Sequence, residues 1–182
     1  MKIFQKIQMA SEDVKSLLKT GVFYAEGVEA VTHDGALVHI GDPVDHDLYS
    51  SMKDLNARKI EAVTSATDKL MGFVDYVGVS QADVMGVTYR IGDKTAGVAP
   101  IAGERIRVRV PVLHDEFWLG VDNFSVEPTI GQYAVPTVGD TILTVQNDAP
   151  ASGLALKVED TKALITGQVN DGKLYRCRVV SR

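Results

Sequence analysis

The 182-residue chain has a single cysteine, Cys177, and therefore cannot form an internal disulfide. We expect a protein of this kind to fold in a reducing cytoplasm. A chain of this length buries roughly 70% of its unfolded surface when it folds, so an ordinary hydrophobic core can hold it together. Neither disulfides nor a structural metal is needed for the fold.

The sequence also lacks long apolar runs and an excess of basic residues. No run approaches the ~20 apolar residues that span a bilayer, and residues 1–8 do not form a secretory signal, so we expect neither a membrane nor an export route. Lys and Arg number 19 against 24 Asp and Glu, for a net charge of -5. This balance argues against a general nucleic-acid-binding protein, which presents a basic face.

Catalytic signatures are missing or broken. Gly92 to Thr95 suggests a phosphate loop, but Asp93 stands where the motif needs glycine and would repel an anion. Residues 72–76 and 89–90 resemble a nucleotide-binding motif of trimeric dUTPases, yet their spacing is wrong and the phosphate segment of that family is absent. We expect no enzyme activity and no cofactor, with a small nucleotide-acting β enzyme as the disfavoured alternative.

Two clusters carry groups that can bind metal or protons. Asp42, Asp45, His46 and Asp47 offer metal-ligand atoms, but no known loop pattern accompanies them. We favour a solvated loop and leave metal binding open. The second cluster is residues 114–118, which we interpret as a turn followed by aromatic residues that pack into a core or an interface, rather than as an acid–base pair.

The N-terminal residues have the pattern of a short helix. Ser11 can cap it, Val14, Leu17 and Leu18 form an apolar stripe, and Gly21 can end it. We therefore predict an N-terminal arm over residues 1–21 with a short helix, followed by a β-rich body over residues 22–182.

From residue 22 onward the pattern has a period of two, which is typical of strands. Hairpin turns are predicted at residues 33–35 and 170–172, and residues 42–56 are the least regular part, with a helical turn within residues 51–58. The fold class is mainly β: a small β-sandwich or a partly closed barrel. The predicted strands are residues 28–32, 36–40, 59–64, 72–79, 105–110, 132–135, 141–145, 154–159 and 174–180.

Several residues are candidates for partner contact. Arg105, Arg107 and Arg109 alternate with aliphatic residues, so they form an arginine row that is either a solvated face or a contact for an acidic partner. An arm can anchor on a neighbour or pack on its own domain, and Trp118 can lie in a core or an interface. The candidate anchors in the arm are Phe4, Ile7, Leu17 and Leu18.

A series of phrases along the chain resembles a group of tailed-bacteriophage virion proteins, the capsid decoration or cement proteins, over about residues 28–182. These phrases are ordinary β segments, not a catalytic signature. They are Asp34-Gly-Ala-Leu-Val-His-Ile-Gly-Asp42, Gly72-Phe-Val-Asp-Tyr-Val77, Tyr89-Arg-Ile-Gly-Asp-Lys-Thr95, Arg105-Ile-Arg-Val-Arg109, Asp115-Glu-Phe-Trp-Leu-Gly120, Pro128-Thr-Ile-Gly-Gln-Tyr-Ala134 and Leu174-Tyr-Arg-Cys-Arg-Val179.

The resemblance implies a β-rich protein of the virion surface, made in the host cytoplasm, that binds the major capsid protein and stabilises the shell. It further implies a homo-oligomer, with a trimer at capsid three-fold positions as the expected form. No catalytic residues are carried over. The alternative from the sequence is another virion component, such as a head-fibre or tail piece that binds a receptor.

Overall fold

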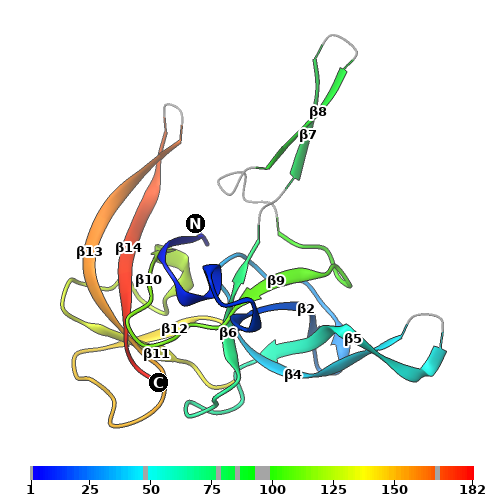
Figure 1. The fold of residues 1–182 in the computed structure, drawn as a ribbon. Coiled ribbons are helices and arrows are strands. Elements are labelled where there is room, and N and C mark those ends of the chain that lie inside the picture. The colour runs from blue at the N-terminus through cyan, green and yellow to red at the C-terminus, as the bar shows by residue number, and fades with distance from the viewer. Residues whose placement is uncertain (1, 47–48, 77–78, 85–86, 93–98, 167–168) are drawn as a thin grey trace.

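In a computed structural model of the chain, the described residues are 2–46, 49–76, 79–84, 87–92, 99–166 and 169–182. They form two six-stranded sheets, one separate hairpin and three short 3₁₀ turns (Figure 1). The strands are β1 (Phe4–Gln8), β2 (Leu18–Ala25), β3 (Val28–Glu29), β4 (Leu37–His46), β5 (Tyr49–Ala62), β6 (Met71–Asp75), β7 (Val79–Val84), β8 (Val87–Gly92), β9 (Ile106–Arg109), β10 (Glu116–Gly120), β11 (Tyr133–Pro136), β12 (Leu143–Gln146), β13 (Ala155–Thr166) and β14 (Val169–Ser181). The 3₁₀ turns are η1 (Ala10–Glu12), η2 (Lys15–Leu17) and η3 (Val121–Asn123).

The first sheet has the strand order β1-β10-β14-β13-β11-β12 and is antiparallel throughout. Its strands form because apolar and polar residues alternate, which gives the sheet one buried and one solvated face. In β10, Phe117 and Leu119 are buried while Glu116 and Trp118 lie on the other face. β14 repeats this pattern with the buried residues Tyr175, Cys177 and Val179.

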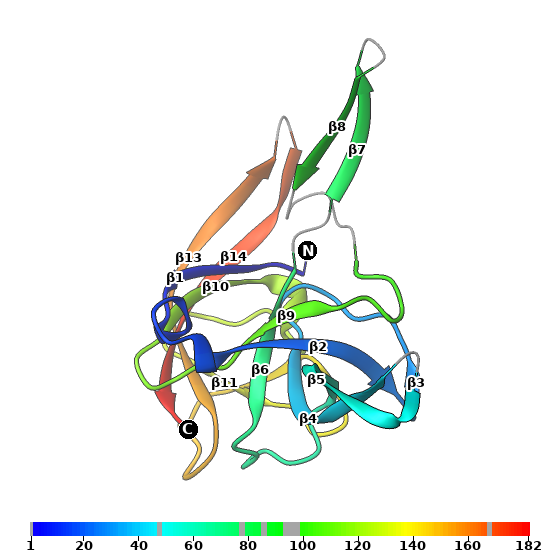
Figure 2. The same ribbon diagram turned by 45° about the vertical axis from the view of Figure 1, so that its right-hand side comes forward.

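The second sheet has the order β3-β2-β5-β4-β6-β9, and an additional β2–β9 pairing closes five of its strands into a ring. β2 and β5 run parallel, and the other pairs are antiparallel. In Figure 2 this barrel lies beside the first sheet. The predicted fold class, mainly β with a sandwich-like, partly closed arrangement, is therefore confirmed.

Two apolar clusters hold these sheets together. Phe4, Phe73 and Phe117 stack between the sheets, with ring centroids 4.9 to 5.9 Å apart. The barrel interior is filled by a second cluster that includes Ile60 and Val108. Burial of each such side chain stabilises the fold by about 1.5–3 kcal/mol, so the interior of the molecule is the main source of its stability.

The predicted N-terminal helix is wrong. Residues 10–17 form two 3₁₀ turns, Val14 between them has an extended backbone, and the chain enters β2 at Leu18. Long-range pairing replaces the local helix signal, because Leu18 lies opposite Arg109 in the β2–β9 ladder. The predicted boundary after residue 21 lies inside β2.

The N-terminal residues pack on their own chain. β1 pairs with β10, and Ile3 and Phe4 are fully buried. Two buried side chains also bind the backbone here: Asn123 Oδ1 accepts a hydrogen bond from the Ile3 amide at 3.0 Å, and Asp34 Oδ2 accepts one from the Phe4 amide at 2.8 Å. Asp115 Oδ1 holds the amide of Ala10 in the same way, at 2.8 Å. Residues 3–11 are thus an integral layer of the fold.

Three local predictions also need correction. Residues 33–35 form a turn, with Gly35 at φ 74°, but β3 pairs with β2 and not with β4, so the turn is not a hairpin. Residues 170–172 belong to β14, where the register shifts, instead of forming a turn. The segment expected to hold a loop and a helical turn contributes to β4 and β5. Asp42 and Asp45 therefore lie in a strand, and Asp47 is outside the described residues.

One hairpin is separate from both large sheets. β7 and β8 pair along six residue pairs and form a two-stranded sheet of their own in the described part of the chain. Both views show this ribbon standing away from the body (Figures 1 and 2). The far end of the β13–β14 pair also extends beyond the other strands of its sheet in both views, and that of the β4–β5 pair does so in Figure 1.

Candidate partner-binding surface

The arginine row lies on β9, between β2 and β6 in the barrel wall. Arg107 is paired with Thr20 on one side and with Asp75 on the other. Ile106 and Val108 point into the barrel core, as the alternation in the sequence predicted. The arginines therefore lie on the outer side of the barrel, where further parts of the chain cover some of them.

Arg109 is the covered member of the row. Only 3% of it is exposed, its Nε donates to Asp75 Oδ2 at 2.6 Å, and its guanidinium also donates to the Ser11 hydroxyl at 3.2 Å. The expectation that all three arginines share one exposed face is thus wrong for Arg109, because the 3₁₀ turn at Ser11 lies over it. Arg109 connects the N-terminal segment to the barrel.

Arg105 and Arg107 remain exposed and line a groove of about 400 Å³, here called the basic groove. Lys19 and Leu18 form its β2 side, and Asp75, Tyr76 and Glu104 also line it. Three cations and two carboxylates line it, and one of these carboxylates, Asp75, pairs with buried Arg109 at 2.6 Å and lies 3.8 Å from Arg107. The groove is therefore locally basic on a protein of net charge -5.

Tyr76 and Glu104 shape the wall of this groove. The Tyr76 hydroxyl donates to both Glu104 carboxylate oxygens at 3.2 and 3.3 Å. Burial, together with this carboxylate, raises the pKa of Tyr76. Glu104 Oε2 also accepts from the amide of Ile101 at 3.0 Å, so the loop before β9 is held against the groove.

The remaining candidate residues are dispersed. Phe4 lies in the aromatic cluster, and Leu17 packs against the barrel core. Ile7, 41% exposed, lies on β1, away from the basic groove's lining. Trp118 is on the outer face of the first sheet, where Lys162 Nζ lies 4.3 Å from its ring centroid. The structure thus brings together Leu18, Arg105 and Arg107 but not the other candidates.

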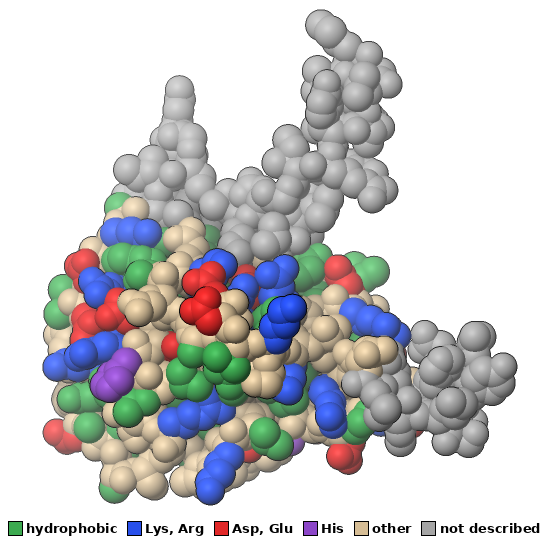
Figure 3. Space-filling view, viewed as in Figure 1, with side chains coloured by type: hydrophobic (Ala, Val, Ile, Leu, Met, Phe, Trp, Pro, Cys, Tyr) green, Lys and Arg blue, Asp and Glu red, His purple; other side chains and the backbone are tan. Residues whose placement is uncertain are grey.

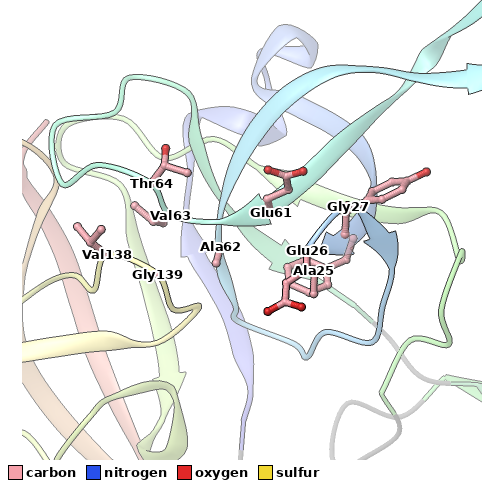
Figure 4. A pocket seen from close by; sticks show the side chains of 11 residues that line it. Ala25, Glu26, Gly27, Glu61, Ala62, Val63, Thr64, Val138 and Gly139 are labelled. Carbon is pink, nitrogen blue, oxygen red and sulfur yellow. The ribbon is translucent and has the colours of Figure 1, made fainter.

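A second groove, of about 550 Å³, lies where the β2–β3 turn meets the end of β5 and residues 138–139. Figure 4 shows Glu26 and Glu61 toward one side of it, with Thr64 and Val138 toward the other. We call it the acidic groove. This groove was not predicted from the sequence, because β2 and β5 meet only through a parallel pairing of distant segments. The Glu26-Gly27 turn was the one local signal that could have pointed to it.

A third groove, of about 520 Å³, is lined in part by Asp68, Lys69 and Arg182. Two of its charged side chains have partners within the chain: Asp68 pairs with His39 and accepts from the Leu70 amide at 2.8 Å, and Arg182 donates to the Lys69 carbonyl at 2.8 Å. These contacts tie the last residue to the loop before β6, which is a structural role.

In the cluster of residues 114–118, His114 and Asp115 hold the local fold of the chain. His114 has φ 72° in the turn before β10, as the turn interpretation predicted, and Asp115 accepts hydrogen bonds from the Ala10 and Val112 amides at 2.8 and 2.9 Å.

Among the residues that the structure describes, no group of three or more His, Cys, Asp or Glu side chains could hold a metal ion. Within the same residues, no helix has the length and apolar character to cross a membrane.

Charged residues of both signs are interspersed over the face seen in Figure 3. Comparison with known proteins adds no relative: no family model matches the chain, and no curated protein or solved structure matches it significantly.

Proposed function

We propose that the protein is a structural protein of a tailed-bacteriophage virion, which binds the major capsid protein on the outside of the assembled head and stabilises the shell. The observation that carries this proposal is the separate β7–β8 hairpin. A two-stranded hairpin alone is at best marginally stable in water, so a ribbon of this kind gains its stability from a partner surface.

The backbone of the hairpin supports a protein partner. Its two strands pair antiparallel from Val79 opposite Gly92 to Val84 opposite Val87, and in the described part of the chain they pair with neither of the two large sheets. The outer edges of such a ribbon present backbone groups to a neighbour, so the ribbon suits strand addition to another protein surface.

The mechanism that follows is thermodynamic. A capsid-bound copy contributes interface area that exists only in the assembled shell, so binding shifts the equilibrium towards assembly by mass action. The phrases that resemble decoration proteins favour the same function. Under this proposal the protein is made in the host cytoplasm, acts at the capsid surface, and needs no cofactor and no nucleic acid.

The test is co-sedimentation of the purified protein with heads of the phage that encodes it, prepared without the protein. We expect saturable binding, whose stoichiometry distinguishes a trimer at three-fold positions from a monomer. Failure to bind at high protein concentration would contradict the proposal.

A second variant tests the hairpin itself. Val79 pairs with Gly92, so their Cα atoms are about 5 Å apart and a Gly-Gly link can replace the residues between them. We expect this variant to unfold at the temperature of the intact protein but to lose head binding. Val126→Ser, which removes an exposed apolar side chain outside the hairpin, is the control and should bind normally.

A further inference from the structure

The acidic groove begins at the β2–β3 turn, where the backbone of Glu26 has a left-handed conformation that is unfavourable for glutamate. Ala25 pairs with Val28, so Glu26 and Gly27 form a two-residue hairpin turn, with φ of 51° and 80°. Such turns favour Asn, Asp or Gly at the first position, and a left-handed conformation costs other residues about 1–2 kcal/mol. Glu26 is thus not the residue that the turn alone would favour, and this strain suggests a role for its carboxylate.

Glu26 and Glu61 are also uncompensated. Among the described residues, neither carboxylate has an ion pair or a side-chain hydrogen bond. Other carboxylates at the surface do have such partners: Glu116 pairs with Arg176 at 2.6 Å, and the Glu127 carboxylate pairs with a lysine at 2.6 Å. The acidic groove therefore presents free negative charge to whatever approaches it.

Exposed apolar side chains border both grooves. Val138, 60% exposed, lines the acidic groove, and Leu18, 36% exposed, lines the basic groove. Ile101, 72% exposed, stands beside the basic groove because its amide is bound to Glu104. Each groove thus combines an excess of one charge with apolar surface, a combination that suits a protein interface.

From this complementarity we propose that the acidic groove of one copy binds the basic groove of a second copy of the same chain. Glu26 and Glu61 pair with Arg105 and Arg107 of the neighbour, and apolar residues at the rims lose contact with water. A chain of net charge -5 repels its own copies at long range, so the local basic groove supplies the attraction that specific self-association needs. This inference concerns contacts between copies and does not depend on the proposed capsid binding.

Sedimentation velocity of the purified protein without heads tests the proposal. We expect concentration-dependent association that weakens between about 0.1 and 1 M salt, because ions screen exposed charges over that range. The double variants Glu26→Lys with Glu61→Lys and Arg105→Glu with Arg107→Glu should each raise the Kd at least about tenfold, the equivalent of 1.4 kcal/mol. Combining all four reversals in one chain should restore association.

Two further variants separate charge from folding. Glu26→Asn suits the turn, so it should weaken association while the protein unfolds at the same or a higher temperature. Asp13→Lys with Asp148→Lys changes the net charge as much as the acidic-groove reversal does, but at exposed positions that do not line either groove. This matched control should lose much less affinity than the reversal of Glu26 and Glu61.

Three results would overturn the proposal: a protein that stays monomeric up to about 100 μM, an affinity unaffected by the groove reversals, or four reversals that fail to restore association. If the arginine reversals changed only the salt dependence of head binding, the basic groove would face the capsid and the copy-to-copy contact would be refuted. Failure to bind heads, with association intact, would refute only the proposed function.

Discussion

Replacing Phe4 with alanine tests whether the N-terminal segment belongs to the core. The ring is fully buried and stacks 5.9 Å from Phe73 and 5.2 Å from Phe117, measured between centroids. A buried Phe→Ala substitution costs about 3–5 kcal/mol, because it removes apolar contacts and leaves a cavity. The backbone bond to Asp34 remains, so we expect loss of core packing with β1 still in place.

The assays are urea unfolding and thermal unfolding, each followed by the fluorescence of Trp118 and by circular dichroism. For a chain of this size each kcal/mol lowers the melting temperature by roughly 2–4 °C, so we expect a decrease of about 6–20 °C. Ile7→Ala on the same strand is the control, and because Ile7 is 41% exposed it should change the stability much less. A Phe4→Ala protein of unchanged stability that had lost only partner binding would refute this reasoning and favour an arm that anchors on a neighbour.

Three further substitutions probe the interior. Arg109→Met leaves the Asp75 carboxylate buried without its closest cation, and we expect denaturant unfolding to show a loss of about 3–5 kcal/mol; an unchanged midpoint would contradict the role assigned to this ion pair. Gly72→Ala should cost about 1–3 kcal/mol in the same assay, because its Cβ would lie 2.6 Å from Val108 and 2.9 Å from a backbone oxygen. Burial lowers the pKa of His33 from 6.5 to about 4, so the unfolded chain binds its proton first as the pH falls. The stability should therefore be complete above pH 6.5 and decrease by roughly 3 kcal/mol towards pH 4, and this part of the pH dependence should vanish in His33→Gln.

The regular strands could be predicted from the sequence because their alternation is local. The pattern of β9 predicted which residues enter the barrel, and Ile106 and Val108 do so. The same pattern could not predict that Arg109 would be buried, because the residue that covers it, Ser11, is 98 positions away. A local pattern thus predicts which residues share a face of a strand, but not which distant segments of the chain cover that face.

The errors at the N-terminus and in the grooves have a related cause. An apolar stripe with a capping serine favours a helix when only neighbours are considered, yet pairing of Leu18 with Arg109 extends β2 in that region. The basic groove was partly predicted because Arg105 and Arg107 are close in sequence. The acidic groove was not, because Glu26 and Glu61 line it only through the parallel pairing of β2 with β5, which no periodicity indicates.

The hydrogen bonds that hold the first residues also set the order in which the protein can fold. The Ile3 amide binds Asn123, 120 residues later in the chain. At 5–20 residues per second, a ribosome takes roughly 6–24 s to make that stretch. During this time the segment that contains Asn123 does not yet exist, so β1 cannot bind to it. Phe4 can pack against Phe117 only after that interval, so closure of the core between the sheets is a late event with the slow kinetics of distant strand pairing.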